Sequence, residues 1–293
     1  MKIFVQVASY RDPELKPTII SALKKANHPK EVSFGICLQV RPKEIVPHLP
    51  LSKLPHCRVV VIEALKSKGI GYARSKAQAM WDGEPYTLQI DSHMRFEKGW
   101  DARLIKSLEN APSNKPIITA YLSDYENEEE TMNFCLGAQK FNPNGLLSLW
   151  GTRVAMKRQR GMFISGHFLF TRSNFFEEVP PDPDMQFLYE ESSLGPRAWT
   201  HGWDIFHPFQ PIMRHRWDRK NRGLNWADKD VTKEGQKSNK LYRQLLGMVP
   251  GFSNYGVYGL GKERALKDFE RVSGVSFRNQ VITEDARNAT FRW

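Results

Sequence analysis

The sequence has few cysteines and no long apolar run. Only three of its 293 residues are cysteine, and Cys37, Cys57 and Cys135 are widely separated. Such a scattered, odd set favours free buried thiols in a reducing compartment over a disulfide framework or a zinc site. No apolar stretch approaches the roughly 20 residues of a membrane span, and the apolar run at the N-terminus is too short and too polar for a signal peptide. These absences predict a soluble, cytoplasmic protein.

Acidic residues are the scarcer charged class. Lys and Arg number 43 against 32 Asp and Glu, which gives a formal net charge of +11. An excess of this size attracts nucleic acid, an anionic membrane surface or a phosphorylated ligand. The densest basic stretches, 157–161 and 214–222, carry no nucleic-acid-binding motif. We therefore expect an anionic small molecule and no nucleic acid as partner, while peripheral contact with an anionic membrane surface stays open.

Strand-like and helix-like segments alternate over the first 122 residues. Apolar runs rich in branched residues predict strands over 2–9, 32–40, 58–64, 86–91 and 116–122. Helical spacing predicts helices over 12–27, 69–83 and 99–112, the first of them capped by Asp12. This alternation predicts an α/β fold with a mostly parallel sheet flanked by helices. We expect one domain over 1–222, with halves of about 1–122 and 123–222, and a C-terminal lobe over 223–293 packed on it.

Polar side chains follow the fourth predicted strand directly. Asp91 and His93 are two residues apart, so on a strand both point to one side while Ser92 faces the other. One oxygen and one nitrogen ligand make an incomplete shell for Mn²⁺ or Mg²⁺ at the edge where α/β sheets bind ligands. Such an ion can hold a diphosphate. A third ligand is open among three later histidines, at least two of which are expected to be ordinary hydrogen-bonded residues: His167, His207 and His215.

Two adjacent glutamates precede a predicted helix in the later half. Glu190 and Glu191 are either a charge pair at the helix start, or residues that bind hydroxyls or assist at a reacting centre. The residues alone leave both interpretations open.

Several segments together carry a family resemblance. The stretches VASYRDPEL, GIGYARSKAQ, YTLQIDSHMRFEKGWD, the run from SGHFLF to DIFHP, and YGLGKERALKDFE occur in this order along nearly the whole chain. They resemble the polypeptide N-acetylglucosaminyltransferase family, which includes the cytoplasmic enzyme that places GlcNAc on hydroxyproline of a ubiquitin-ligase subunit. More distantly, DSH and EESSLGPRAW resemble the metal-binding and acceptor-loop segments of mucin-type polypeptide GalNAc-transferases.

The resemblance implies a GT-A fold, a UDP-sugar donor, a divalent metal and retention of anomeric configuration. It implies that Asp91 and His93 are metal ligands with His215 as the third, and that Glu190 opens the acceptor-side loop, with the share of Glu191 undecided. Donor contacts are implied for Ser9, Tyr10, Arg11, Arg74, Asp91 and Ser92. Arg74 is also expected to assist departure of UDP, although Arg11 and Arg74 could each instead pair with an acidic neighbour.

The expected function is therefore metal-dependent, retaining transfer of a sugar, GlcNAc before others, from a UDP-sugar to a hydroxyl of a protein or glycan. Mn²⁺ is the expected ion and Mg²⁺ the second choice. On this interpretation 1–222 is a GT-A catalytic domain with a donor half and an acceptor half. The alternatives are a catalytically inactive nucleotide-sugar or carbohydrate-binding protein of the same fold, and a transferase for another UDP-sugar such as UDP-GalNAc.

Overall fold

A computed structural model describes residues 1–44, 51, 56–127, 132–251, 255–291 and 293. The strands are β1 (Ile3–Tyr10), β2 (Val32–Val40), β3 (Cys57–Glu63), β4 (Tyr86–Asp91), β5 (Met94–Phe96), β6 (Pro116–Thr119), β7 (Tyr121–Leu122), β8 (Asn133–Phe141), β9 (Leu147–Val154), β10 (Gln159–Gly161), β11 (Phe168–Arg172), β12 (Asp204–His207), β13 (Met213–His215), β14 (Val275–Ser276) and β15 (Val281–Ile282). The α-helices are α1 (Leu15–Lys25), α2 (Ile70–Gln78), α3 (Trp100–Glu109), α4 (Phe175–Glu178), α5 (Phe187–Thr200), α6 (Asn225–Asp228), α7 (Thr232–Leu245), α8 (Leu266–Ser273) and α9 (Glu284–Arg287).

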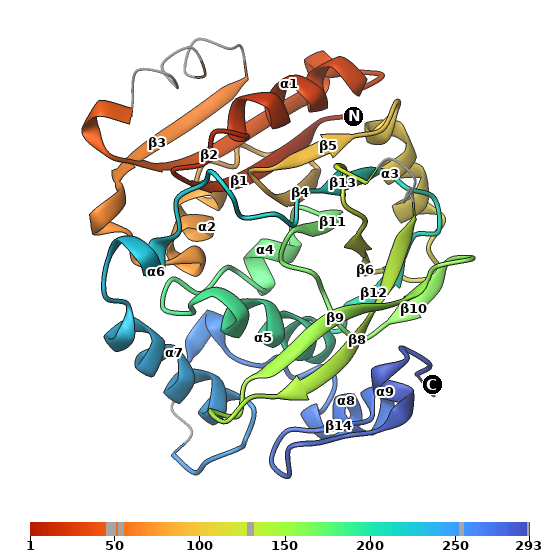
Figure 1. The fold of residues 1–293 in the computed structure, drawn as a ribbon. Coiled ribbons are helices and arrows are strands. Elements are labelled where there is room, and N and C mark those ends of the chain that lie inside the picture. The colour runs from red at the N-terminus through yellow and green to blue at the C-terminus, as the bar shows by residue number, and fades with distance from the viewer. Residues whose placement is uncertain (45–50, 52–55, 128–131, 252–254, 292) are drawn as a thin grey trace.

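An eight-stranded mixed sheet forms the centre of the molecule, in the order β10-β12-β6-β11-β4-β1-β2-β3 (Figure 1). Strands β3, β2, β1 and β4 are parallel neighbours, as the alternation of strands and helices predicts. Strand β11 lies antiparallel between β4 and β6, so the fourth and fifth predicted strands are not adjacent. Because β1 and β4 pair in parallel, their carboxyl ends lie side by side at one edge of the sheet.

One predicted strand is wrong in its extent. The run 116–122 divides at Ala120 into β6, in the central sheet, and β7, in a separate sheet of order β7-β8-β9. All of these residues are apolar or β-branched, so their pattern carries no sign of the change of sheet.

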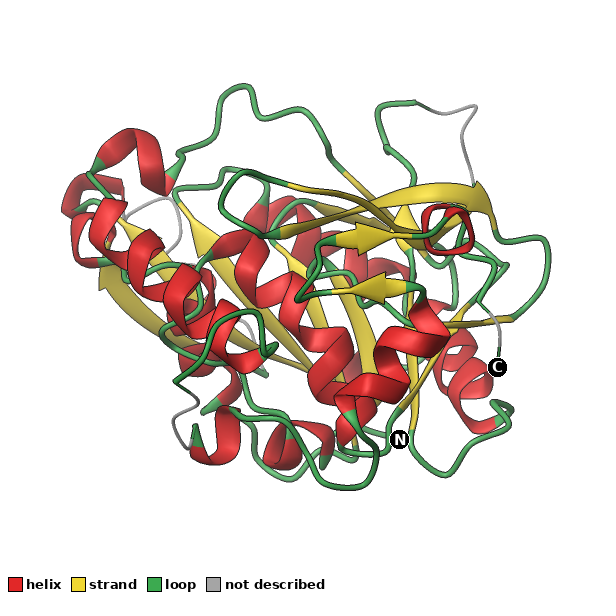
Figure 2. Ribbon diagram, turned by 90° about the horizontal axis from the view of Figure 1, so that it is seen from below, coloured by secondary structure: helices red, strands yellow, loops and turns green. Residues whose placement is uncertain are grey.

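Helices cover both faces of the parallel strands (Figure 2). Helices α1 and α3 bury Ile19 and Leu104 in one core cluster with Val5 of β1. On the opposite face, α2 packs Ala73 and Ala77 against Cys37 of β2. Helix α1 begins at Leu15 and ends at Lys25, so it is shorter at both ends than the predicted 12–27.

The C-terminal segment shares a core with the β8–β9 hairpin. Tyr242 of α7 and Phe269 of α8 lie in one buried cluster with Leu136 of β8. The predicted boundary at residue 222 stays a prediction. Among the described residues, no helix combines the length and the apolar character that crossing a membrane requires.

Candidate active site

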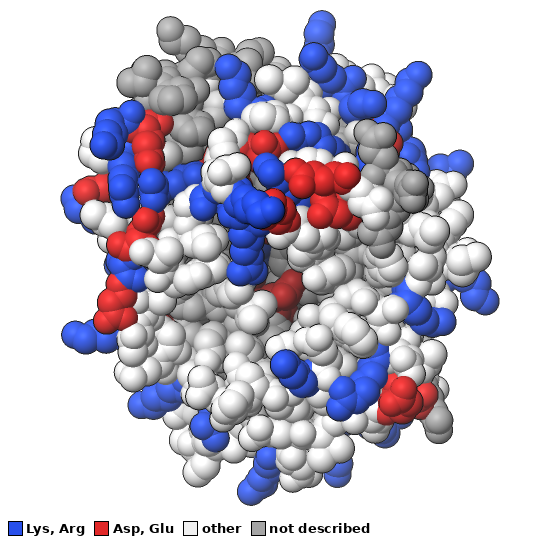
Figure 3. Space-filling view, in the orientation of Figure 1, with Lys and Arg blue, Asp and Glu red and all other residues white. Residues whose placement is uncertain are grey.

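A pocket of about 310 Å³ opens at the carboxyl ends of β1 and β4. Figure 3 shows a hollow near the centre of one face, with acidic atoms at its bottom and basic side chains along its upper rim. The pocket wall comes from the strand exits, from α2 and α5, and from the segment 215–226. Its carboxylates are Asp12, Asp91, Glu190 and Glu191. Residues 223–226 of the predicted C-terminal lobe line this same pocket.

Three of the sequence-predicted residues converge in this pocket. Asp91 ends β4, His93 lies in the turn before β5, and His215 ends β13, which pairs antiparallel with β5 in the register His215 to Met94. Asp91 Oδ2 is 3.3 Å from His215 Nε2 and 3.6 Å from His93 Nε2. One donor atom from each of the three residues lies within 4.8 Å of the others.

The protonation states of this cluster suit a metal site. Burial lowers the pKa of His215 to about 4, so its imidazole is neutral at pH 7. Burial alone would raise the pKa of Asp91, but the hydrogen bond from His215 and the charges of His93 and Arg74 outweigh burial and hold it well below its usual range. A neutral imidazole and an ionised carboxylate are the forms that bind a cation. Mixed imidazole and carboxylate donors fit a first-row divalent ion such as Mn²⁺ better than Mg²⁺, which prefers oxygen.

The other two candidate histidines have different partners. His167 Nδ1 lies 2.7 Å from Ser165 Oγ, and its Nε2 accepts the backbone N–H of Leu122 at 3.3 Å. His207 Nδ1 lies 2.9 Å from the backbone oxygen of Thr119. Both are thus ordinary hydrogen-bonded residues, although His167 also lines the pocket. His215 is the histidine of the three that contacts Asp91 in the described part of the chain.

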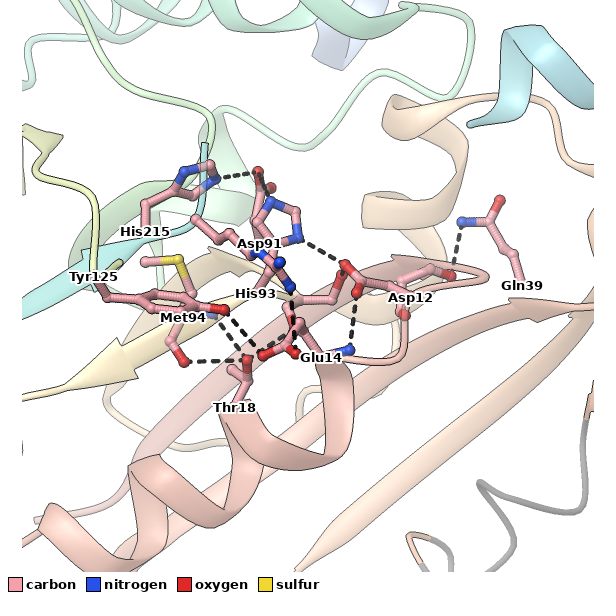
Figure 4. A network of polar contacts seen from close by, with 12 residues as sticks. Asp12, Glu14, Thr18, Gln39, Asp91, His93, Met94, Tyr125 and His215 are labelled. Carbon is pink, nitrogen blue, oxygen red and sulfur yellow. Dashed lines mark hydrogen bonds and ion pairs between the residues drawn. The ribbon is translucent and has the colours of Figure 1, made fainter. Parts of the chain in front are cut away.

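Asp12 has a different role from the predicted one. It does not cap α1, whose N-cap is Glu14, and it lies in the pocket wall with 2% of its surface exposed. Its Oδ2 is 2.7 Å from His93 Nδ1 (Figure 4). The same oxygen accepts the Ser92 hydroxyl at 2.7 Å. Burial would raise the pKa of Asp12, but the hydrogen bond and charge of His93 keep it below its usual value. Ser92 thus points to the same carboxylate as His93, not away from it.

Arg74 of α2 joins the metal cluster to the glutamates of α5. Its guanidinium donates to Glu190, to the backbone oxygen of Gly166, and to Asp91 Oδ1 at 3.3 Å. Arg74 and Glu190 are both buried. Burial raises the pKa of Glu190 despite the nearby Arg74 charge. Arg74 therefore takes part both in the acidic pairing and in the pocket wall.

Glu191 faces the same part of the pocket. Its Oε1 accepts the backbone N–H of Gly166 at 2.7 Å. Burial raises its pKa to about 7; the Gly166 hydrogen bond opposes this rise and the charge of Glu190 adds to it. Glu191 is thus a carboxyl group that changes charge near neutral pH, which is the range in which general acids and bases operate.

Of the predicted donor contacts at the end of β1, one lines the pocket and two, Ser9 and Arg11, do not. Tyr10 lines the pocket, and its hydroxyl donates to Asp228 Oδ2 at 2.8 Å. The Arg11 guanidinium is occupied by Glu44 and Asp228, so the pairing with acidic neighbours is the arrangement observed, and Arg11 does not line the pocket. Ser9 is fully buried outside the pocket wall. Of these three residues, only Tyr10 lines the pocket.

Comparison with known proteins identifies the family. The family model described as glycosyltransferase (GlcNAc) matches residues 2–53 and 49–279. The chain belongs to this glycosyltransferase family. No curated protein matches it. The fold is similar to a solved structure titled "Crystal structure of GalNAc-T7 with UDP, GalNAc and Mn2+", with a TM-score of 0.58, 15% identity, and coverage of 92% of this chain and 54% of that chain. The chain thus spans about half the length of that protein, and the likeness confirms the predicted GT-A fold.

Two aromatic side chains that the sequence analysis leaves unassigned, Tyr121 and Trp217, lie in the pocket wall. Tyr121 and Trp217 stack with ring centroids 4.3 Å apart, beside His167 and His215. The sequence offered a weak signal for Trp217, since it follows His215 by two residues. Tyr121 carries no such signal, because it lies inside the apolar run 116–122, which predicts a single strand.

Proposed function

We propose that this glycosyltransferase moves GlcNAc from UDP-GlcNAc to a hydroxyl of a protein or glycan, with retention of anomeric configuration and with Mn²⁺ bound. One observation carries the proposal: Asp91, His93 and His215 converge in one pocket, with Arg74 in contact with the same carboxylate. The family match supports a sugar transferase, and the GalNAc-T7 structure, which holds UDP and Mn²⁺, supports a UDP-sugar and a divalent ion.

The residues have distinct roles in the proposed transfer. A cation held by Asp91, His93 and His215 would bind the donor diphosphate and stabilise the negative charge that grows on departing UDP. Arg74 adds a fixed positive charge beside Asp91, at the place where that charge develops. Glu190 holds Arg74 in position through their buried ion pair. Tyr10 borders the region proposed for the nucleoside.

Retention follows when the acceptor hydroxyl attacks from the face that UDP leaves. In the proposed arrangement the acceptor enters along the wall formed by α5, where Glu191 lies. A carboxyl group with a pKa of about 7 can exchange a proton with a bound hydroxyl near neutral pH. We therefore assign contact with the acceptor hydroxyl to Glu191 and the positioning of Arg74 to Glu190.

The acceptor and the cellular location follow as finer parts of the proposal. The resemblance to hydroxyproline-modifying enzymes makes a hydroxyproline peptide the first acceptor to test, and a glycan the second. A cytoplasmic location is supported by three cysteines that are all free thiols. The net charge of +11 supports peripheral contact with an anionic membrane surface.

UDP-GalNAc is the second candidate donor, because the similar GalNAc-T7 structure contains GalNAc. A binding protein without turnover is disfavoured, since the proposed ligands and the Arg74–Glu190 pair are all in place. These alternatives differ in what a donor assay would detect.

The test is release of UDP from a panel of UDP-sugars, with Mn²⁺ and with a chelator, with and without a hydroxyproline peptide. We expect UDP release from UDP-GlcNAc that needs Mn²⁺ and is abolished in Asp91→Asn. Faster release from UDP-GalNAc would make UDP-GalNAc the donor and leave the proposed mechanism unchanged. Binding of UDP without release from any sugar would favour the inactive alternative, and absence of UDP binding would contradict the transferase proposal.

A further inference from the structure

Asp12 is in the pocket wall, but the proposed transfer gives it no role. It belongs to the loop between β1 and α1, and its carboxylate is nearly fully buried. Oδ2 lies 2.7 Å from His93 Nδ1 and accepts the Ser92 hydroxyl at 2.7 Å, while Oδ1 accepts the backbone N–H of Glu14 at 2.9 Å. Asp12 thus joins the start of α1 to the turn that carries His93.

The contacts of Asp12 determine which nitrogen of His93 is free. An ionised carboxylate has no hydrogen to donate, so it can only accept a hydrogen bond. His93 must therefore carry its proton on Nδ1, and in the neutral ring this leaves a lone pair on Nε2. Nε2 is the atom that faces Asp91 Oδ2 at 3.6 Å, on the side of His215 (Figure 4). In its neutral form the ring therefore presents an acceptor, and not an N–H, to the metal cluster.

The same turn is also held through its backbone. Thr18 of α1 is fully buried, donates to the backbone oxygen of Ser92 at 2.8 Å, and accepts the backbone N–H of Met94 at 2.8 Å. The backbone at residues 92 and 94 is thus fixed on either side of His93. What remains for Asp12 is the rotation of the imidazole and its tautomer.

We propose that Asp12 is a positioning residue for metal binding: it orients the His93 ring and fixes the Nδ1–H tautomer, so that Nε2 is available to the cation. The metal part of this inference rests on the proposed function. The tautomer part concerns only this chain and holds without any ion. Carboxylate partners of metal-binding histidines generally contribute 10- to 100-fold in affinity.

Asparagine cannot replace Asp12 at this position. Both carboxylate oxygens accept hydrogen bonds, Oδ1 from Glu14 and Oδ2 from Ser92 and His93. An amide has one oxygen, so its NH₂ must face either the backbone N–H of Glu14 or the ring nitrogen of His93. If the NH₂ faces His93, it favours a lone pair on Nδ1 and moves the proton to Nε2. If it faces Glu14, a donor meets a donor at the start of α1.

A matched control, Asp101, lies on α3 at the other end of α1. Asp101 of α3 is also buried, and its two oxygens accept the backbone N–H groups of Asn27 and His28, each at 2.8 Å. Asp101→Asn introduces the same chemical change in a buried, backbone-bonded carboxylate, but it lies at the other end of α1. It therefore controls for lost stability without touching His93.

The test combines two measurements on wild type, Asp12→Asn and Asp101→Asn. Nitrogen-15 NMR of the histidine rings in metal-free protein, recorded at a pH at which the His93 ring is neutral and with His93 assigned from a His93→Gln sample, should show Nδ1–H in wild type and Asp101→Asn. Titration with Mn²⁺, followed by the paramagnetic resonance of the free ion, should show about 10- to 100-fold weaker binding in Asp12→Asn and no such loss in Asp101→Asn.

Two results would overturn the inference. One is an Nε2–H tautomer of His93 in the wild-type protein, a measurement that needs no variant to fold. The other is Mn²⁺ affinity in folded Asp12→Asn equal to that of wild type. If wild type binds no Mn²⁺, the proposed function fails. The NMR measurement then still decides whether Asp12 fixes the tautomer of the His93 ring.

Discussion

Replacing Arg74 with methionine should cost far more stability than the loss of one hydrogen bond. Arg74 is 5% exposed and Glu190 is 2% exposed, and they form an ion pair. Methionine fills the space but leaves Glu190 buried without its cation. Removing one partner of a buried pair typically costs about 3–5 kcal/mol. Since domains are commonly stable by about 5–15 kcal/mol in total, Arg74→Met should be folded but clearly weakened.

The matched change is Glu190→Gln. Arg74 then keeps Asp91 Oδ1 and the backbone oxygen of Gly166 as acceptors, so its charge is not left unpaired. We expect a smaller loss, about 1–3 kcal/mol. In the double variant neither charge of the pair is stranded, so its loss should be smaller than the sum of the two single losses by about 0.5–3 kcal/mol.

Urea unfolding at pH 6 and pH 8 measures these differences. In Arg74→Met, Glu190 has a folded-state pKa raised further above its unfolded value. The folded state then holds a proton that the unfolded state has released, so stability falls as pH rises above the unfolded pKa. The Arg74→Met loss should therefore be larger at pH 8. A loss below about 1 kcal/mol together with additive single variants would refute the assigned pairing.

Three further predictions concern the ion, the pH response and the pocket rim. Mn²⁺ at about 100 times its Kd should raise the free energy of unfolding by about 2.7 kcal/mol in wild type but not in His215→Ala, as followed by thermal unfolding with and without chelator; equal shifts would contradict the ligand set. The folded-state pKa of Glu191, about 7, exceeds its unfolded value, so wild-type stability should fall as pH rises from 5 to 7. The free energy of unfolding of Glu191→Gln, measured with urea, should fall less over that range. Parallel curves for the two proteins would refute the assigned pKa. Asp228 bonds to Tyr10, Arg11 and Arg41, so Asp228→Ala should speed tryptic cleavage at 219–222 relative to the exposed control Asp230→Ala; equal cleavage rates would show that this cluster does not hold the rim.

The parallel half of the sheet could be predicted because its signals are local. Branched apolar residues mark β1 to β4, and a helical stretch follows β1, β3 and β4, which predicts a mostly parallel sheet. The position of β11 could not be predicted in this way. It depends on pairing across long sequence separations, which periodicity does not report.

The candidate site was predictable where a possible metal ligand directly follows a predicted strand. Asp91 and His93 fit that condition, and His215 came from the family resemblance. Asp12 also follows a strand, but its position before a helix made it look like a cap, and the partner that defines its role lies about 80 residues away. The occupation of Arg11 by Asp228 likewise joins residues 217 apart. Such contacts are set by the tertiary fold and have no local pattern.

The central claim is that Asp91, His93 and His215 hold a divalent ion against the diphosphate of a UDP-sugar. It is tested most directly by crystals grown with Mn²⁺ and UDP, with anomalous scattering recorded at the manganese edge. The account predicts one strong peak within coordination distance of Asp91 and of Nε2 of both histidines, contacted also by the diphosphate. UDP bound in the pocket with no manganese at these three residues would contradict it.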